Sequence, residues 1–381
     1  FDPNGIKMSR PPLIVLADDL TGAAELAAIA HENGRRAMVF TSVPRDPVDA
    51  DVLVFSTDTR LLTATQAARR VKLFSIAAKK MSPAGIFKKV DSVLRGPVIA
   101  EAEACAEVFG FDRVILVPAN PSLGRVIRDG KYFVDGLPLH HTAFAHDPHH
   151  PVRSPVVNDL LGLKKTSPSV CLAPAAPLPV RGLFVGETTS GADIIRWAQR
   201  SDATTLPAGG ADFFRAWLNR RSGLRRRQVH HRLPAGPALL LHGTTSTLVQ
   251  CGALLFSGRR PPSKDAVAAA LRRGRSAIVA ASQSTARDSK SHHPIAAGFA
   301  QLVRALQRAD EFRHLLITGG ATAGAVLSEL RWSGFEVSHV WGSGAVTLRP
   351  TAAPDFAVTL KPGSYSWPAK LRRAVPRIFP S

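Results

Sequence analysis

The sequence predicts an α/β protein with two domains, each an open, mostly parallel sheet flanked by helices, and an active site in the cleft between them. Short apolar runs alternate with longer helical segments, which is typical of buried strands joined by crossover helices. This alternation is interrupted by a charged stretch, residues 221–236, and restarts at residue 238. The length of 381 residues also suits two domains. We therefore expect one domain over residues 10–236 and another over residues 237–381.

The composition is that of a water-soluble globular protein. Hydrophobic residues make up 45% of the chain, and its mean hydropathy is +0.02. No apolar run is long enough to span a membrane, and no secretory leader is visible at the first residues. The three cysteines, Cys105, Cys171 and Cys251, are widely spaced, as in proteins of a reducing compartment. We expect a cytoplasmic protein with no membrane partner.

The chain is strongly basic, with 49 Lys and Arg against 29 Asp and Glu and a formal net charge of +20. Such a balance suits either nucleic acid or small anionic substrates. The arginines form short runs, such as residues 225–227 and 372–373, and no zinc-finger spacing or aromatic RNA-binding motif accompanies them. We therefore expect solvated basic faces and no nucleic-acid partner.

Two carboxylates follow the first predicted strand. Residues 12–17 form a continuous apolar run, after which Asp18, Asp19 and Thr21 precede a predicted helix over residues 23–33. Ligands of open α/β sheets bind at the carboxyl ends of the strands. Asp18 or Asp19 can instead cap the helix, but one cap needs only one carboxylate. The second carboxylate is therefore a candidate for binding a ligand.

The fourth predicted strand delivers a second polar group. Strands are expected at residues 37–40, 52–56 and 85–90, with a helix over residues 63–80, and the last strand leads into Asp91 and Arg95. Arg95 could bind a carboxylate through two nitrogens, while Asp91 could bind or deprotonate a hydroxyl. Either Lys88 or Lys89 could join them. The alternative is an ion pair within a loop, which contributes little at a surface.

A third polar group follows the strand predicted at residues 113–117. The turn after it contains Gly124 and Arg125, and residues 129–136 then suggest a hairpin. Three strand ends that carry polar groups in one alternating pattern favour a shared site. The histidines at positions 140, 141, 146, 149 and 150 match no standard zinc spacing, so we expect a loop there and no metal site.

The second predicted domain offers phosphate-binding features without a Walker motif. The strand at residues 238–242 leads into a hydroxyl-rich turn, residues 243–247, and then into a helix predicted to continue through Leu255. The strand at residues 315–318 leads into Gly319 and Gly320 and a helix over residues 323–332, which Thr322 could cap. Adjacent glycines let a backbone approach a ligand, and a helix start favours an anion. An ordinary strand-to-helix turn would use the same residues.

Together these motifs resemble the four-carbon acid sugar kinase family, whose members phosphorylate tetronates with ATP. The similar blocks occur in family order along nearly the whole chain: residues 17–23, 88–96, 118–125, 132–139, 147–148 and 361–366. Val93 stands where the family has a threonine, and residues 361–366 depart from its closing Lys-Ser-Gly-Asn-Phe-Gly motif.

The resemblance implies an ATP- and Mg²⁺-dependent kinase that phosphorylates a hydroxyl of threonate, erythronate or 3-oxo-tetronate. The first domain would bind the sugar acid and the second the nucleotide. The catalytic candidates are Asp19 and Asp91, of which one would orient or deprotonate the hydroxyl. The substrate-binding candidates are Asp18, Thr21, Lys89, Arg95, Gly124 and Arg125. The candidates for contact with ATP are Thr244, Ser246, Gly319, Gly320, Ala321, Thr322 and Gly363.

A second interpretation is a protein of the same fold that binds a sugar acid and a nucleotide but has lost turnover, which the altered closing motif suggests. The sequence leaves open which tetronate and stereoisomer is used, which hydroxyl reacts and which carboxylate is the base. It is also compatible with either a monomer or a homo-oligomer.

Overall fold

The structure is a computed structural model that describes residues 11–147, 149–164, 166, 168, 170–221, 232–243, 253–256, 260–281, 292–342, 344–363, 366–376 and 378–379. The chain forms two compact units. The first unit contains Phe1–Arg35 and Ser42–Arg226, and the second contains Arg36–Thr41 and Arg227–Ser381. The short strand β2 (Ala37–Phe40) therefore belongs to the second unit, although the segments on both sides of it belong to the first.

The first unit is built on a parallel sheet with the strand order β3-β1-β4-β11-β5-β10-β9. These strands are short, as expected for runs buried on both faces. Their carboxyl ends lie along one edge of the sheet because neighbouring strands are parallel. The bounds are β1 Leu13–Ala17, β3 Val52–Ser56, β4 Gly85–Lys89, β5 Arg113–Val117, β9 Cys171–Leu172, β10 Gly182–Gly186 and β11 Thr205–Gly209.

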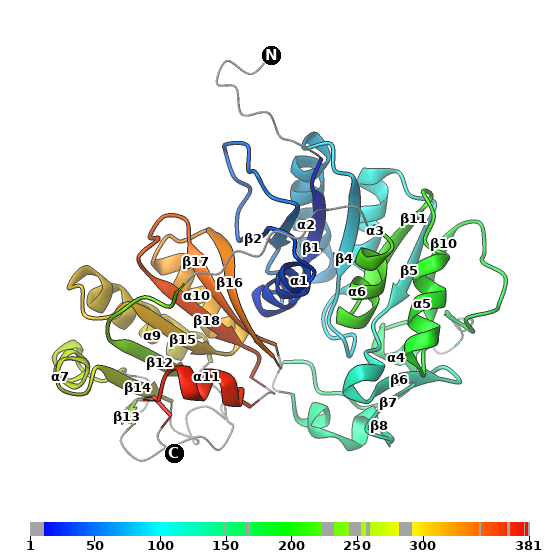
Figure 1. Cartoon of the computed structure of the whole chain (residues 1–381). Helices are drawn as coiled ribbons and strands as arrows, with labels where there is room; N and C mark the ends of the chain where they lie inside the picture. Colours follow the sequence, from blue (N-terminus) through cyan, green and yellow to red (C-terminus); the bar gives the residue numbers. More distant parts are fainter. Residues whose placement is uncertain are drawn as a thin grey trace. The chain divides into compact units, whose positions relative to one another are not determined.

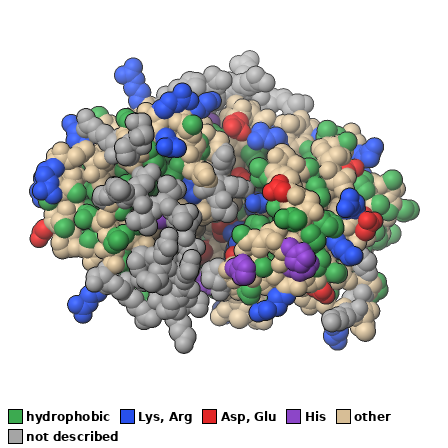
Figure 2. Space-filling model, turned by 90° about the horizontal axis from the view of Figure 1, so that it is seen from below, with side chains coloured by type: hydrophobic (Ala, Val, Ile, Leu, Met, Phe, Trp, Pro, Cys, Tyr) green, Lys and Arg blue, Asp and Glu red, His purple; other side chains and the backbone are tan. Residues whose placement is uncertain are grey.

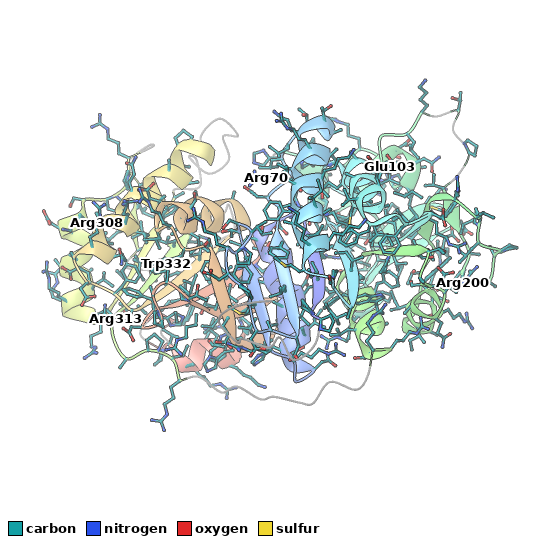
Figure 3. The ribbon with its side chains drawn as sticks, turned by 90° about the horizontal axis from the view of Figure 1, so that it is seen from above. Arg70, Glu103, Arg200, Arg308, Arg313 and Trp332 are labelled. Atoms are coloured by element: carbon teal, nitrogen blue, oxygen red, sulfur yellow. The ribbon has the colours of Figure 1, made fainter. Side chains whose placement is uncertain are left out.

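Helices cover both faces of this sheet (Figure 1). The helices α2 and α3 pack together on one face, and the labelled Arg70 and Glu103 mark them in Figure 3. On the other face α6 packs against both α1 and α5. The bounds are α1 Leu20–Glu32, α2 Ala64–Lys80, α3 Val98–Phe109, α4 Val157–Leu160, α5 Gly191–Gln199 and α6 Ala211–Asn219.

A small antiparallel sheet follows β5. Its strands are β6 (Arg125–Arg128), β7 (Lys131–Val134) and β8 (Leu137–Pro138), and the pairing of β6 with β7 confirms the predicted hairpin. Short 3₁₀ helices flank it: η1 (Pro121–Leu123) before it, and η2 (Leu139–His141) and η3 (Ala143–His146) after it.

Aromatic side chains fill the space between the first sheet and α6. The ring of Phe87 on β4 contacts those of Phe213, Phe214 and Trp217, with centroids 5.1 to 5.7 Å apart. All four side chains are buried. Burial of side chains of this size contributes on the order of 2 kcal/mol each before entropy is counted. This core holds β4, and with it the polar residues that follow the strand.

The second unit is a mixed sheet with the order β13-β14-β12-β15-β18-β17-β16-β2. The strands β13, β14, β12, β15 and β18 are parallel, while β17 is antiparallel to β18 and to β16. The edge strand β2 pairs antiparallel with β16. The bounds are β12 Ala238–His242, β13 Leu254–Leu255, β14 Ser276–Ala280, β15 His314–Thr318, β16 Gly334–Gly342, β17 Ala345–Pro350 and β18 Ala357–Lys361.

The helices of the second unit are α7 Lys264–Gly274, α9 His292–Arg308, α10 Gly320–Glu329 and α11 Ala369–Ala374. Helix α9 packs against α10 and α7. Helix α11 covers strands of the same sheet (Figure 1), where Trp367 and Leu371 join Leu240 and Leu316 in one apolar cluster. Among the described residues no helix has both the length and the apolar character that crossing a bilayer requires.

One predicted element of this unit is wrong. Leu254 and Leu255, expected at the end of a helix, form β13 and pair with Val279 and Ala280 of β14. The two residues extend the sheet, because their backbone pairs with β14 and does not form a helical turn. Residues 244–252, which the same prediction covered, lie outside the described residues, as does most of the charged stretch at 222–231.

Candidate active site

Three carboxylates lie around one arginine at the carboxyl edge of the first sheet. Asp18 and Asp19 follow β1, and Asp91 follows β4. The Nε atom of Arg60 donates to Asp18 Oδ2 at 2.7 Å, and Nη1 donates to Asp19 Oδ2 at 2.9 Å. The Nη2 atom lies 2.9 Å from Asp19 Oδ1 and 3.6 Å from Asp91 Oδ1. One guanidinium thus draws together residues from three neighbouring strand ends.

Asp19 also begins the first helix. Its Oδ1 accepts a hydrogen bond of 2.8 Å from the backbone N–H of Gly22, which caps α1, and its Oδ2 accepts one of 2.5 Å from Thr21. Burial opposes ionisation of Asp19, but Arg60 and Lys89 outweigh it and lower the pKa. Asp19 is therefore ionised at neutral pH.

Asp18 does not cap α1, so the sequence analysis was right that one carboxylate is left over. Its Oδ2 accepts from Arg60, whereas its Oδ1 is buried and has no hydrogen-bond partner among the described residues. A buried carboxylate oxygen without a donor is costly unless a ligand supplies one. This atom is the clearest vacant acceptor at the edge.

Asp91 is held by Arg95. The Nε and Nη2 atoms of Arg95 donate to the two oxygens of Asp91 at 2.9 and 2.7 Å, and the backbone N–H groups of Val93 and Arg95 donate to Asp91 Oδ2 as well. Burial opposes ionisation of Asp91, but Arg95 and Arg60 hold its pKa well below the usual range. The third nitrogen, Nη1, donates to Asp147 Oδ2 at 2.7 Å. The guanidinium expected to bind a substrate carboxylate thus already binds two carboxylates of the chain.

The structure distinguishes the positions of Lys88 and Lys89, which the sequence alone left open. Successive side chains of a strand point to opposite faces. Lys88 faces helix α3, where its Nζ lies 2.6 Å from Glu101 Oε2 and both side chains are buried. Lys89 lies next to the start of α1 instead. A Cβ atom placed on Gly22 would be 3.2 Å from Lys89 Nζ.

The turn after β5 and the hairpin add Arg125. Its Nη1 donates to Ser92 Oγ at 2.5 Å, and its guanidinium carbon lies 5.6 Å from the centre of the Phe144 ring. Gly124 has φ +65°, and a side chain there would collide with Asp135 Oδ1. Gly124 is therefore required for the turn, and the structure gives it no other contact that suggests a ligand.

The glycine turn of the second unit lies at the carboxyl end of β15. Gly319 has φ +97°, which favours glycine, and helix α10 begins directly after it at Gly320. No side chain among the described residues caps this helix. Its first N–H groups, from Gly320, Ala321 and Thr322, point out of the helix end without intrahelical acceptors, as in anion-binding helix starts.

The predicted cap by Thr322 is wrong because the helix starts earlier than expected. Thr322 lies inside the first turn, where its side chain is buried and faces Gly243 at the end of β12. A side chain at Gly243 would collide with Thr322 Oγ1. Thr318, the last residue of β15, is also buried, and its hydroxyl has no hydrogen-bond partner in the described part of the chain.

A lysine lies next to this turn. The N–H of Gly319 donates to the backbone carbonyl of Lys361 at 2.9 Å, and Lys361 pairs with Thr318 in the register of β15 and β18. Lys361 Nζ lies 5.4 Å from the centre of the Trp367 ring. Burial lowers the pKa of Lys361 to about 8. Gly363 follows two residues later and is partly exposed, while Thr244 and Ser246 lie outside the described residues.

Sequence reasoning missed Arg60 and Asp147 as residues of the site. Arg60 belongs to a polar cluster that follows β3, so its position at a strand end was the available signal. Asp147 is distant in sequence from Arg95, and no local pattern connects the two. Within the described residues no group of histidine, cysteine and carboxylate side chains could hold a metal ion. The rings of His140 and His141 lie 3.9 Å apart without such a site.

On the face shown in Figure 2, the described Lys and Arg side chains lie scattered among hydrophobic and other residues. Several are held in ion pairs, such as Arg313 with Asp310 and Arg304 with Glu329.

Two family models match the chain. A sugar-binding N-terminal domain matches residues 13–199, and a nucleotide-binding C-terminal domain matches residues 250–365. The chain belongs to the four-carbon acid sugar kinase family. The first match contains all of the carboxylates and basic residues described at the edge of the first sheet, and the second contains the glycine turn at Gly319.

Curated relatives in this family are similar over different lengths. The D-threonate kinase of Salmonella typhimurium is 35% identical over 158 residues, which is 41% of this chain and 37% of that protein. The alignment thus spans less than half of that relative. The D-threonate kinase of Cupriavidus necator is 28% identical over 94% of this chain and 92% of its own length. Two further relatives, each 33% identical, are named D-erythronate kinase and 3-oxo-tetronate kinase.

A solved structure has the same fold. A Haemophilus influenzae protein of the DUF1537 family matches with a TM-score of 0.69 at 18% identity, over 93% of this chain and 97% of its own. The match supports the mostly parallel α/β architecture along nearly the whole chain.

Proposed function

We propose that this protein is a kinase that uses Mg-ATP to phosphorylate a hydroxyl of a four-carbon sugar acid of the threonate, erythronate or 3-oxo-tetronate type. The observation that carries the proposal is the charged group at Asp18, Asp19, Arg60 and Asp91, where acceptors for sugar hydroxyls lie beside cations for a carboxylate. The names of the curated relatives support the same reaction.

The first unit would bind the sugar acid. Asp18 Oδ1 is free to accept a hydrogen bond from a substrate hydroxyl, and Asp19 or Asp91 would orient the hydroxyl that reacts. Both of the latter carboxylates have lowered pKa values. Ionised carboxylates suit a phosphoryl transfer in which positioning and charge matter most and the substrate hydroxyl loses its proton late in the reaction. Thr21 would fix the orientation of Asp19.

The substrate carboxylate would be bound by Lys89 and Arg125. Both side chains reach the same edge of the first sheet as Asp19. Arg95 would act mainly as a positioning residue, because its nitrogens bind Asp91 and Asp147. Gly124 would act through the turn that presents Arg125.

The second unit would bind ATP. The first N–H groups of α10, from Gly320, Ala321 and Thr322, suit phosphate oxygens, and Gly319 allows the close approach of the backbone. We also assign nucleotide contacts to Thr244, Ser246 and Gly363. Mg²⁺ usually keeps several waters and is held by one or two carboxylates together with substrate phosphates, so it needs no cage of protein ligands. It would neutralise the phosphate charge as transfer proceeds.

The test is an ADP-release assay with Mg-ATP and a panel of D- and L-threonate, D- and L-erythronate and 3-oxo-tetronate. We expect turnover on at least one of these acids, with none when the acid is omitted. ATP binding by calorimetry without ADP release on any of them would contradict the proposal. That outcome would favour a binding protein without turnover, for which Pro362 in the altered closing motif is the supporting observation.

A further inference from the structure

Glu25 lies on the face of α1 that meets the candidate active site. It follows Gly22 by three residues and Thr21 by four, and residues at these spacings share one face of a helix. That face is fixed by two observations: Thr21 Oγ1 donates to Asp19 Oδ2, and a Cβ on Gly22 would be 3.2 Å from Lys89 Nζ. Glu25 therefore lies one helical turn beyond the point where α1 contacts Lys89.

Charged groups from four other places surround Glu25. They are Lys89 at the end of β4, Asp19 after β1, Arg125 on β6 and Asp212 in the first turn of α6, and each acts on Glu25 electrostatically. Burial raises the pKa of Glu25, which Lys89 and Arg125 counteract and Asp19 and Asp212 reinforce. The two cations are those to which we assign the substrate carboxylate.

The other acidic groups near the site have partners. Asp212 accepts hydrogen bonds from the N–H and hydroxyl of Ser122, and Asp19 accepts from Arg60 and Thr21. Within the described residues the carboxylate of Glu25 makes no hydrogen bond or ion pair. At the far end of the same helix, Glu32 lies 3.1 Å from Arg215. Glu25 is thus the partly exposed acceptor of α1 that a ligand could satisfy.

We propose that Glu25 accepts a hydrogen bond from a hydroxyl of the sugar acid and so determines which stereoisomer the enzyme prefers. This inference rests on the proposed function. D-threonate and D-erythronate carry the same groups and differ only in the configuration of one hydroxyl-bearing carbon. An isomer that turns this hydroxyl away would leave the carboxylate of Glu25 unpaired, and a site built for a hydroxyl discriminates strongly on that ground.

The test compares two substitutions that differ in one property. Glu25→Gln removes the charge but keeps an acceptor oxygen, whereas Glu25→Met removes both at similar length. Glu32→Gln, on the same helix and outside the site, is the matched control. For each protein kcat and KM are measured with D-threonate and with D-erythronate, together with the KM for ATP and the melting temperature.

We expect Glu25→Met to change the ratio of kcat/KM for the two isomers by about tenfold or more, and Glu25→Gln to change it less, since an acceptor remains. The KM for ATP should stay within about twofold, and Glu32→Gln should resemble the wild type, because neither depends on this hydroxyl. An unchanged ratio in Glu25→Met would overturn the inference. Equal effects of Gln and Met would also overturn it, because a purely electrostatic role predicts them.

The outcome can be separated from a failure of the proposed function. If the wild type turns over neither these isomers nor any other acid of the panel, the kinase proposal fails and this inference fails with it. If the wild type is active and the ratio is insensitive to Glu25, only the inference fails. Should Glu25→Met not fold, Glu25→Asp retracts the carboxylate by one methylene, and an unchanged ratio in that variant would overturn the inference equally.

Discussion

Arg60 binds the carboxylate of Asp19 through two nitrogen–oxygen contacts of 2.9 Å each. The same guanidinium binds Asp18 and lies 3.6 Å from Asp91. Three carboxylates so close together would repel one another without a cation between them. Arg60 lowers the pKa of both Asp19 and Asp91 and so favours their ionised forms in this arrangement.

Replacing Arg60 by Met should impair both catalysis and stability. Loss of the cation leaves the buried Asp18 without its arginine partner, and breaking a buried pair in this way typically costs about 3–5 kcal/mol. We expect kcat/KM for the sugar acid to fall by roughly 100-fold or more, since Asp19 and Asp91 would lose their shared partner. Steady-state kinetics and urea unfolding would measure the two effects. Arg69→Met on the exposed surface of α2 is the control, and wild-type kinetics in Arg60→Met would contradict the role given to Arg60.

Replacing Asp91 by Asn tests which carboxylate acts on the hydroxyl. If Asp91 accepts the proton, kcat should fall by about 10²–10⁴-fold with little change in the KM for ATP. Asp19→Asn should then cause the smaller loss. A larger loss of kcat in Asp19→Asn than in Asp91→Asn would indicate that Asp19 accepts the proton. Wild-type turnover in Asp91→Asn would exclude Asp91 from the chemistry. Single-turnover measurements would separate the chemical step from product release.

Replacing Gly319 by Ala should weaken ATP binding. The positive φ of +97° disfavours any residue with a Cβ, and Gly319 directly precedes the first N–H groups of α10. Gly110→Ala is a matched control because Gly110 also has a positive φ, +81°, with open space around it. Both variants should lose about 1–2 kcal/mol of stability. Only Gly319→Ala should raise the dissociation constant of ATP, measured by calorimetry, and equal affinities in both variants would refute a phosphate contact at this turn.

His314 should make the second unit sensitive to mild acid. Burial lowers the pKa of His314 to about 4, and its Nε2 lies 2.7 Å from Thr359 Oγ1. The unfolded chain, with a histidine pKa near 6.5, binds the proton first, so stability is full above about pH 6.5 and falls toward pH 4. The full loss is about 3 kcal/mol.

Urea unfolding between pH 7 and pH 4 would measure this loss. His314→Gln should show a shallower dependence of the free energy of unfolding on pH, whatever its stability at pH 7. His141→Gln, at an exposed position, should keep the wild-type slope. Parallel slopes for the wild type and His314→Gln would show that another group titrates.

The sequence predicted the strand ends of the first unit well, because continuous apolar runs and the polar residues after them are local signals. Asp18, Asp19 and Asp91 were placed at strand ends in this way. Which lysine of the pair 88 and 89 faces the site could not be predicted, since that depends on which face of β4 is packed against α3.

Contacts between distant segments account for what was missed. Arg60 was missed because its three carboxylate partners come from two other strand ends. The pairing of Arg95 with Asp147 depends on the loop after η3 folding back onto the segment that follows β4. Leu254 and Leu255 carry no alternating pattern, so their pairing with β14 decides that they form a strand.

The position of strand β2 limits how the chain can be divided into separately expressed units. Its residues precede most of the first unit in the sequence, yet β2 is an edge strand of the second and pairs with β16 through Phe40, Val39 and Met38. A fragment cut at residue 227 would lack this strand and expose the backbone of β16, which invites pairing with another chain. A single cut at residue 227 therefore does not yield the complete second unit, and a fusion that preserves this unit must also supply residues 36–41.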